Sequence, residues 1–144
     1  MAKDKGADLF VVSTDEESVK ACAGKCDIIL STVSANHDLN VYIPLLAKSG
    51  NLVQIGAATA PHTLSQLPLM FGRLSVSGSI IGGVEATQEC VDFCAKHKVY
   101  PDCKVIEAKE IDWAWDELRK SNADGVRFVV DIKKSLENKD FLPA

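Results

Sequence analysis

Apolar and polar positions along this chain form two patterns, which alternate along the sequence. Short runs that are almost continuously apolar, such as "CDIILST" at 26–32 and "NLVQIGA" at 51–57, are typical of strands buried on both faces of a parallel sheet. Elsewhere apolar residues recur at helical spacing, for example at 85–97. The alternation predicts an α/β protein in which right-handed helical crossovers connect parallel strands.

The same distribution of apolar and polar residues predicts the bounds of the individual helices and strands. Thr14 or Asp15 is expected to cap the first helix and Gly24 to end it, while Pro44, which lacks an N–H, is expected to kink or delay the second helix. Strands are expected at 8–12, 26–32, 51–57, 74–80, 103–108 and 125–132. Helices are expected at 15–24, 39–47, 85–97 and 111–118. The segment 64–73 is expected to be either a short helix or two turns interrupted by Pro68.

Small residues gather where three of the expected strands end. The stretches are "STVSA" (31–35), "GAA" (56–58) and "SIIGG" (79–83). Taken alone, Gly82-Gly83 is explained by a tight turn between a strand and a helix. Ligands of parallel sheets collect at the carboxyl ends of the strands, however, and glycine lets a ligand come close to the backbone. Three such ends together therefore favour a ligand site.

Composition narrows the class of protein. A chain of 144 residues has the size of one ordinary domain, and its 47% hydrophobic and 25% charged residues are typical of a globular protein. The net charge of -4, without a basic cluster, argues against a nucleic-acid partner. The sequence shows neither a signal-peptide core nor the roughly 20 apolar residues of a membrane span. We therefore expect a cytoplasmic protein that does not bind membranes.

Cysteine and histidine spacing does not assign a metal site. The five cysteines are an odd number in a chain without an export signal, so reduced thiols are expected. Each of the two C-x3-C pairs, Cys22/Cys26 and Cys90/Cys94, could be half of a metal site, but zinc sites need about four ligands. Small buried thiols are the favoured interpretation. The three histidines are scattered, and His97 is expected to end a helix.

Three long blocks resemble a known family. They are "CDIILSTVSANHDLNVYIPLLAKSGNLVQIGA", "GRLSVSGSIIGGVEATQECVDFCAKHKV" and "GVRFVVDI", and the similarity runs from Lys5 to Ile132. In this order they closely resemble the C-terminal part of zinc-dependent medium-chain alcohol dehydrogenases, in the cinnamyl-alcohol-dehydrogenase-like branch. The resemblance implies a partial Rossmann-type, doubly wound parallel sheet, the second half of a dinucleotide-binding domain, followed by a C-terminal strand-helix-strand segment.

The resemblance also implies a chemistry. In this family a hydride moves between a primary alcohol or aldehyde and NADP(H), while a catalytic zinc polarises the substrate oxygen. Arg127 resembles the arginine that reaches the cofactor's phosphates, and the alternative is a surface cation on a strand. Carried over by position, the residues that would line the cofactor are Thr32, Val33 and Ser34; Gly56 and Ala57; and Ser79, Ile80, Gly82 and Gly83.

The sequence also departs from the family. Neither the zinc ligands nor a G-x-G-x-x-G turn is found, nor the acidic or basic residue that chooses between NAD and NADP. We therefore expect a fragment, with 1–100 as an incomplete dinucleotide-binding domain, 101–132 as a segment that returns to the catalytic domain, and 133–144 as a tail. As an isolated chain it is expected to lack catalytic residues, metal ligands and turnover, and to bind NADP(H) weakly or not at all.

An incomplete sheet leaves exposed edges. The expected strand 8–12 either pairs with the edge of strand 26–32, or is displaced, or another chain covers that edge. In the family the edge of the last strand forms the subunit dimer, so the segment 75–80 is the candidate for a homodimer contact. The alternative function is a non-catalytic module that binds a nucleotide or dimerises.

Overall fold

The computed structural model describes residues 2–120 and 125–137. These residues form two compact units, Met1–Ile81 and Gly82–Ala144, which we call the first and the second unit and describe separately. No helix in the described ranges is long and apolar enough to cross a membrane.

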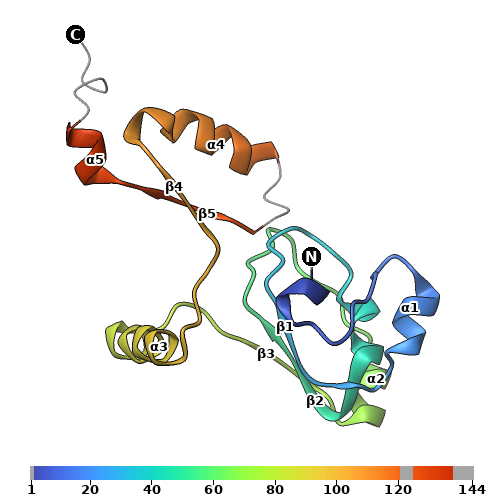
Figure 1. Cartoon of the computed structure of the whole chain (residues 1–144). Coiled ribbons are helices and arrows are strands. Elements are labelled where there is room, and N and C mark those ends of the chain that lie inside the picture. Colours follow the sequence, from blue (N-terminus) through green and yellow to red (C-terminus); the bar gives the residue numbers. More distant parts are fainter. Residues whose placement is uncertain (1, 121–124, 138–144) are drawn as a thin grey trace. The chain divides into compact units, whose positions relative to one another are not determined.

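The first unit is built on a parallel sheet of three strands in the order β1-β2-β3 (Figure 1). The strands are β1 (Cys26–Ser31), β2 (Leu46–Gln54) and β3 (Ser75–Gly78). At their carboxyl ends Ser31 pairs with Gln54, which pairs with Gly78. The strands therefore end side by side at one edge of the sheet, as parallel pairing of the predicted apolar runs requires.

One helix precedes the first of these strands, two short turns connect β1 to β2, and a second helix connects β2 to β3. They are α1 (Glu16–Ala21), α2 (Gln66–Gly72) and the 3-10 turns Leu39–Val41 and Ile43–Leu45. Asp15, rather than Thr14, caps α1, because its side chain accepts a hydrogen bond from the backbone N–H of Glu17 at 3.2 Å. Beyond the helix end, Gly24 adopts a positive φ of 68°, which side chains disfavour.

Two of the secondary-structure predictions for the first unit were wrong. The segment 39–47 forms 3-10 turns instead of a helix, and β2 already begins at Leu46. Pro44 supplies no N–H for a regular helix, so the apolar residues around it are buried by tighter turns. The segment 8–12 forms no strand: Leu9 and Phe10 are 58% and 62% exposed. A short apolar run becomes a strand only when a sheet edge receives it, and here the described part of β1 pairs with β2 alone.

The core of the first unit lies on one face of the sheet. Leu52, near the carboxyl end of β2, is fully buried and packs with Leu39, Ile43 and Leu46. Partly buried residues complete this cluster: Ile29, Leu64, Leu69 and Leu74. The side chains of Ile28 and Leu30 lie on the opposite face of β1 and are 64% and 61% exposed.

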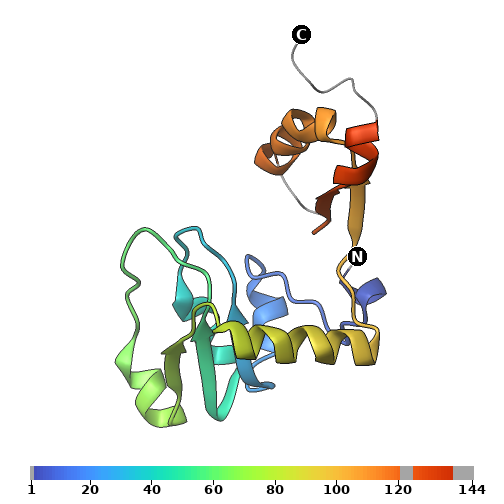
Figure 2. The same ribbon diagram turned by 90° about the vertical axis from the view of Figure 1, so that its left-hand side faces the viewer.

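The second unit contains a long helix and a strand-helix-strand segment (Figure 2). Its elements are α3 (Val84–His97), β4 (Cys103–Ile106), α4 (Ile111–Lys120), β5 (Arg127–Val130) and α5 (Ile132–Glu137). Strands β4 and β5 pair in parallel, and His97 ends α3 as expected. Helix α5 includes residues 133–137 of the segment expected to be a tail, while 138–144 lie outside the described residues.

Contacts inside the second unit join its strands and helices. The ring of Trp113 in α4 packs edge-on against Phe128 in β5, with centroids 5.4 Å apart, and Lys104 Nζ lies 4.3 Å from the Trp113 ring centroid. Ser135, which is buried, accepts a hydrogen bond from the N–H of Ala108 at 2.8 Å and donates one to the carbonyl of Asp131 at 2.6 Å. A single hydroxyl thus joins α5 to the turn that follows β4.

Candidate functional site

The carboxyl edge of the first unit's sheet is extended by hydrogen bonds just beyond the strands. The N–H groups of Ile55 and Gly56 both donate to the carbonyl of Ser31, each at 2.9 Å. The N–H of Ser79 donates to the carbonyl of Gln54 at 3.0 Å. Each loop is therefore held to the neighbouring strand where it leaves the sheet.

Gly56 lies where the loop after β2 comes close to the loop after β1. A Cβ atom built on Gly56 would lie 2.4 Å from the carbonyl oxygen of Val33 and 2.7 Å from the carbonyl carbon of Thr32. Both atoms belong to the backbone, so no rotamer change could relieve the contact. The absence of a side chain at Gly56 therefore lets the loop after β1 come close, whether or not a ligand also approaches this backbone.

The other predicted residues of the first unit lie at this edge with exposed side chains. Ile80 is 86% exposed and Val33 45%. The remaining exposed members are Thr32, Ser34, Ala57 and Ser79. The structure thus brings Thr32, Val33 and Gly56 into contact and places Ser79 one strand further along the same edge. What this arrangement offers chemically is a row of small side chains and main-chain polar groups, without a titratable residue among them.

The remaining three predicted residues belong to the second unit. Gly83 precedes α3 with a φ of -70°, so its conformation does not require glycine, and a Cβ atom there would meet nothing within 4 Å. A Cβ atom on Gly82 would lie 3.2 Å from Cβ of Ala86, against the first turn of α3. Arg127 is exposed and begins β5, where its N–H donates to the carbonyl of Asp102 at 2.9 Å.

Polar side chains that the sequence analysis did not single out hold the loops after β1 and β2 together. Asn36 Oδ1 accepts a hydrogen bond from the N–H of Ala60 at 3.1 Å. Asn40 Nδ2 donates to the carbonyl of Thr63 at 2.9 Å, and Asn40 Oδ1 accepts from the N–H of Ser65 at 2.8 Å. The polar stretch "NHDLN" indicates side chains that bond to backbone, but the partners lie 23 to 25 residues away and are not evident from the sequence.

Asp38 and His37 lie within the same stretch. The backbone N–H of Asn40 donates to Asp38, which lowers the pKa of this carboxyl group below its ordinary value; the Asn40 side chain and His37 add smaller effects in the same direction. The ring of His37 lies against the ring of His62, with centroids 5.0 Å apart. The sequence suggested that the histidines are scattered. In the structure, His37 and His62 instead form a contact between the two loops.

Metal-binding side chains do not converge in the described ranges. Within residues 2–120 and 125–137, no three side chains of His, Cys, Asp and Glu are arranged to hold a metal ion. All five cysteines are free. Burial raises the pKa of the Cys94 thiol, and the neighbouring Cys90 raises it further. The described residues thus do not fit the catalytic zinc of the family, and we derive no step through that metal.

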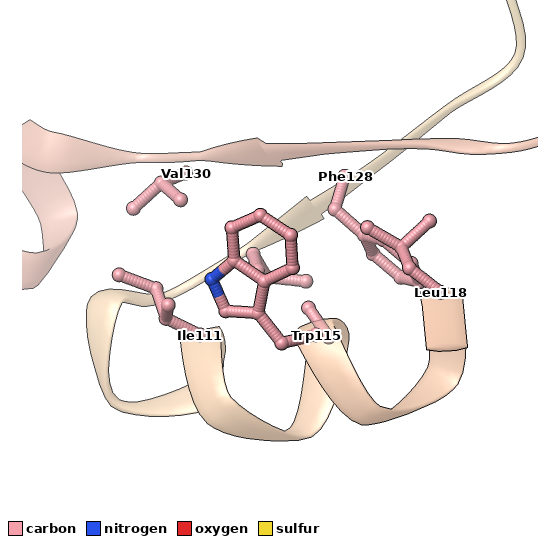
Figure 3. Close-up of a pocket in the computed structure, with 7 residues that line it drawn as sticks. Ile111, Trp115, Leu118, Phe128 and Val130 are labelled. Carbon is pink, nitrogen blue, oxygen red and sulfur yellow. The ribbon is translucent and has the colours of Figure 1, made fainter. Parts of the chain in front are cut away.

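A separate apolar pocket of about 200 Å³ lies in the second unit, between α4 and the β4-β5 pair (Figure 3). The indole of Trp115 points from α4 toward β5, between Val130 and Phe128. The pocket is lined by Ile106, Ile111, Ala114, Trp115, Leu118, Phe128 and Val130. Because none of these side chains titrates, the pocket offers packing surface rather than catalytic groups.

The parallel sheet with its row of small residues at the strand ends defines a Rossmann-like cofactor-binding domain of the alcohol dehydrogenase type. Residues 1–96 match the family pattern described as zinc-binding dehydrogenase, and the chain belongs to this family. It is 45% identical over 131 residues to cinnamyl alcohol dehydrogenase 3 of Arabidopsis thaliana, covering 91% of this chain and 35% of that protein. It is 40% identical to the probable formaldehyde dehydrogenase AdhA of Bacillus subtilis, covering 91% of this chain and 37% of that protein.

Solved structures agree with these relatives. A cinnamyl alcohol dehydrogenase from Sorghum bicolor superposes with a TM-score of 0.84 at 34% identity, over 93% of this chain and 38% of its own. A cinnamyl alcohol dehydrogenase from Helicobacter pylori, complexed with NADP(H), superposes with a TM-score of 0.68 at 38% identity, over 81% of this chain and 34% of its own. The resemblance seen in the sequence is confirmed, and the chain spans a little over a third of the length of the curated relatives it matches.

Proposed function

We propose that this chain supplies the nicotinamide side of an NADP(H) site in an alcohol dehydrogenase that interconverts primary alcohols and aldehydes. The observation that carries the proposal is the carboxyl edge of the β1-β2-β3 sheet, where three strand ends in register present small, exposed residues. The NADP(H) complex of the Helicobacter pylori relative, at 38% identity, supports the choice of cofactor. When bound, the cofactor would supply or accept the hydride.

The residues of this chain would bind and orient the cofactor. We assign Thr32, Val33 and Ser34 to the ribose side, and Ala57 with Gly56 to the nicotinamide ribose and carboxamide. Their small side chains leave main-chain polar groups accessible to an amide, and the hydrogen bonds to Ser31 fix the edge before the cofactor arrives. Ser79, Ile80, Gly82 and Gly83 are assigned to the nicotinamide end, and Arg127 to a phosphate.

The two halves of the cofactor provide a direct test. Reduced nicotinamide mononucleotide and adenosine 2′,5′-bisphosphate would each be titrated into the isotope-labelled 144-residue chain while amide NMR shifts are recorded. We expect millimolar binding of the nicotinamide half, with shifts centred on residues 32–34, 56–57 and 79–80. Adenosine bisphosphate that shifts the same amides equally, or a nicotinamide half that shifts none of them, would contradict the assignment.

For the 144-residue chain itself we propose that no alcohol turnover occurs. The support is that the described residues contain no group of three side chains able to hold a metal. Zinc-dependent NADPH oxidation with an aldehyde, proportional to the concentration of the purified chain and abolished by chelation, would contradict this. Such an assay also separates catalysis from cofactor binding, which the NMR titration measures independently.

A second candidate function is a dimerisation module. All four residues of β3 are exposed, and within the described chain this strand lies at the edge of its sheet. We infer that a second copy pairs along β3, because unpaired edges invite strand addition. Sedimentation velocity would test this: the wild-type chain should dimerise, and Ser77→Lys, which places like charges on the paired edges, should remain monomeric. An equally dimeric Ser77→Lys variant would contradict pairing at β3.

A further inference from the structure

The histidine pair in the first unit joins two loops that are far apart in sequence. His37 follows β1 and His62 follows β2, yet their rings meet edge to face with an interplanar angle of 65°. The ring of Tyr42 also contacts the ring of His37, with centroids 5.9 Å apart. None of these rings is part of the strand-end row assigned above to the cofactor.

Both imidazoles carry a nitrogen that the fold does not satisfy. Nε2 of His37 and Nε2 of His62 are buried, and neither has a hydrogen-bond partner within the described part of the chain. Nδ1 of His37 lies 2.8 Å from the carbonyl oxygen of Ala35. Because a carbonyl only accepts, Nδ1 must carry the hydrogen, and in the neutral ring Nε2 is left with its lone pair. Histidines that bind metals show this arrangement, with one ring N–H donated to a backbone carbonyl and the other nitrogen facing the ion.

The surroundings hold the pair in place. Leu39 and Leu64 follow the two histidines by two residues each, and both leucines pack in the core of the first unit. The same two loops are joined by hydrogen bonds from the N–H of Ala60 to Asn36 and from the side chain of Asn40 to the carbonyl of Thr63. The Asp38 carboxylate, which interacts electrostatically with His37, adds negative charge beside the pair. These contacts hold the two loops, and with them the two imidazole rings, in place.

We propose that Nε2 of His37 and Nε2 of His62 bind one divalent cation of the zinc, nickel or cobalt class, with water completing its coordination. Neutral imidazole suits these ions, whereas magnesium and calcium prefer oxygen ligands. Two protein ligands are fewer than the four of a structural zinc site, so the bound ion exchanges with solvent. It ties the loops after β1 and β2 together. The proposal is independent of cofactor binding and stands or falls separately from it.

Nickel(II), which is paramagnetic, provides a direct test on the untagged 144-residue chain. The sequence contains three histidines, so each imidazole signal can be assigned and His97 serves as an internal control. As nickel is added up to one equivalent, the signals of His37 and His62 should broaden together while that of His97 stays sharp. Magnesium at the same concentration should leave all three unchanged. Since His97 lies on α3 three residues after Cys94, capture of nickel by the Cys90/Cys94 thiols would broaden His97 first and overturn the proposal.

Matched variants measure how much each ligand contributes. In calorimetric titrations His37→Gln and His62→Gln should each bind nickel at least tenfold more weakly than the wild-type chain, while His97→Gln should bind as tightly. Equal affinity of either loop variant would overturn the site. If a loop variant loses its folded amide spectrum, imidazole 15N shifts of the wild-type chain with diamagnetic zinc decide the question: Nε2 of both rings should shift, and a shift of only one Nε2 refutes a shared ion.

Discussion

Gly56→Ala should loosen the carboxyl edge of the sheet. The new Cβ would lie 2.4 Å from the carbonyl oxygen of Val33, whereas ordinary contact begins at 3.4 Å, so the difference, 3.4 - 2.4, requires the loop after β1 to retreat by about 1 Å. The hydrogen bonds from Ile55 and Gly56 to Ser31 are 2.9 Å long, and the same retreat would stretch them beyond bonding range.

The cost has two parts. Forcing an extra carbon into a tight contact typically costs about 1–3 kcal/mol, and each lost hydrogen bond adds about 0.5–1.5 kcal/mol. With both hydrogen bonds lost, we therefore expect Gly56→Ala to lower the free energy of unfolding by about 2–6 kcal/mol. Gly78→Ala is the matched control in the same row of strand ends, because a Cβ there would lie 3.8 Å from the carbonyl oxygen of Gln54, an ordinary contact.

Urea unfolding followed by far-ultraviolet circular dichroism gives both free energies by linear extrapolation. Hydrogen exchange of peptides from β1 and β2 should show the loss locally, as faster exchange in Gly56→Ala and unchanged exchange in Gly78→Ala. A Gly56→Ala chain as stable as the wild type, or a Gly78→Ala chain destabilised equally, would refute the reasoning from backbone contact.

Three further changes test the packing and electrostatics of the two units. Leu52→Ala removes a fully buried side chain and should cost about 2–5 kcal/mol in urea unfolding, whereas Leu67→Ala, at a position 64% exposed, should stay within about 0.5 kcal/mol of the wild type. Ser135→Ala leaves the N–H of Ala108 without its acceptor and should cost about 1–3 kcal/mol, against no measurable loss for the exposed Ser75→Ala. The 2.9 Å contact with Glu107 raises the pKa of Lys134, so its stabilisation is present below the ordinary lysine pKa and disappears as the pH rises through the raised value. The difference in urea midpoint between wild type and Lys134→Gln should accordingly be constant from neutral pH to about pH 10 and shrink above it; a difference that grows with pH would contradict this.

The parallel strands were predictable because their apolar runs are nearly continuous, as in 26–31. The expected burial on both faces is not seen in the described residues of β1, where Ile28 and Leu30 are exposed. Helix boundaries followed from caps such as Asp15. The segment 39–47 was misread because its apolar spacing fits both a helix and successive 3-10 turns. Only packing around Pro44 decides between them. The segment 8–12 was misread because strand formation depends on an available partner, which local sequence does not specify.

For the site, the sequence identified the strand ends but not their internal contacts. Small residues after three strands were a sufficient signal for the row that includes Thr32 and Ser79. The contact of Gly56 with Val33 depends on register between strands, which a single sequence does not encode visibly. The His37–His62 contact joins loops separated by a whole strand, so spacing along the chain made the two residues look unrelated.

Placement of the aromatic residues gives each unit its own optical probe. Both tryptophans of the sequence, Trp113 and Trp115, belong to α4 in the second unit. Tyr42, beside the histidine pair, belongs to the first unit. Indole emission excited at the red edge therefore reports on α4 and its strands. The second tyrosine, Tyr100, belongs to the second unit, so in a Tyr100→Phe variant the tyrosine emission comes from Tyr42 alone. Nickel added to the histidine pair of that variant should quench the tyrosine emission and leave the indole signal unchanged.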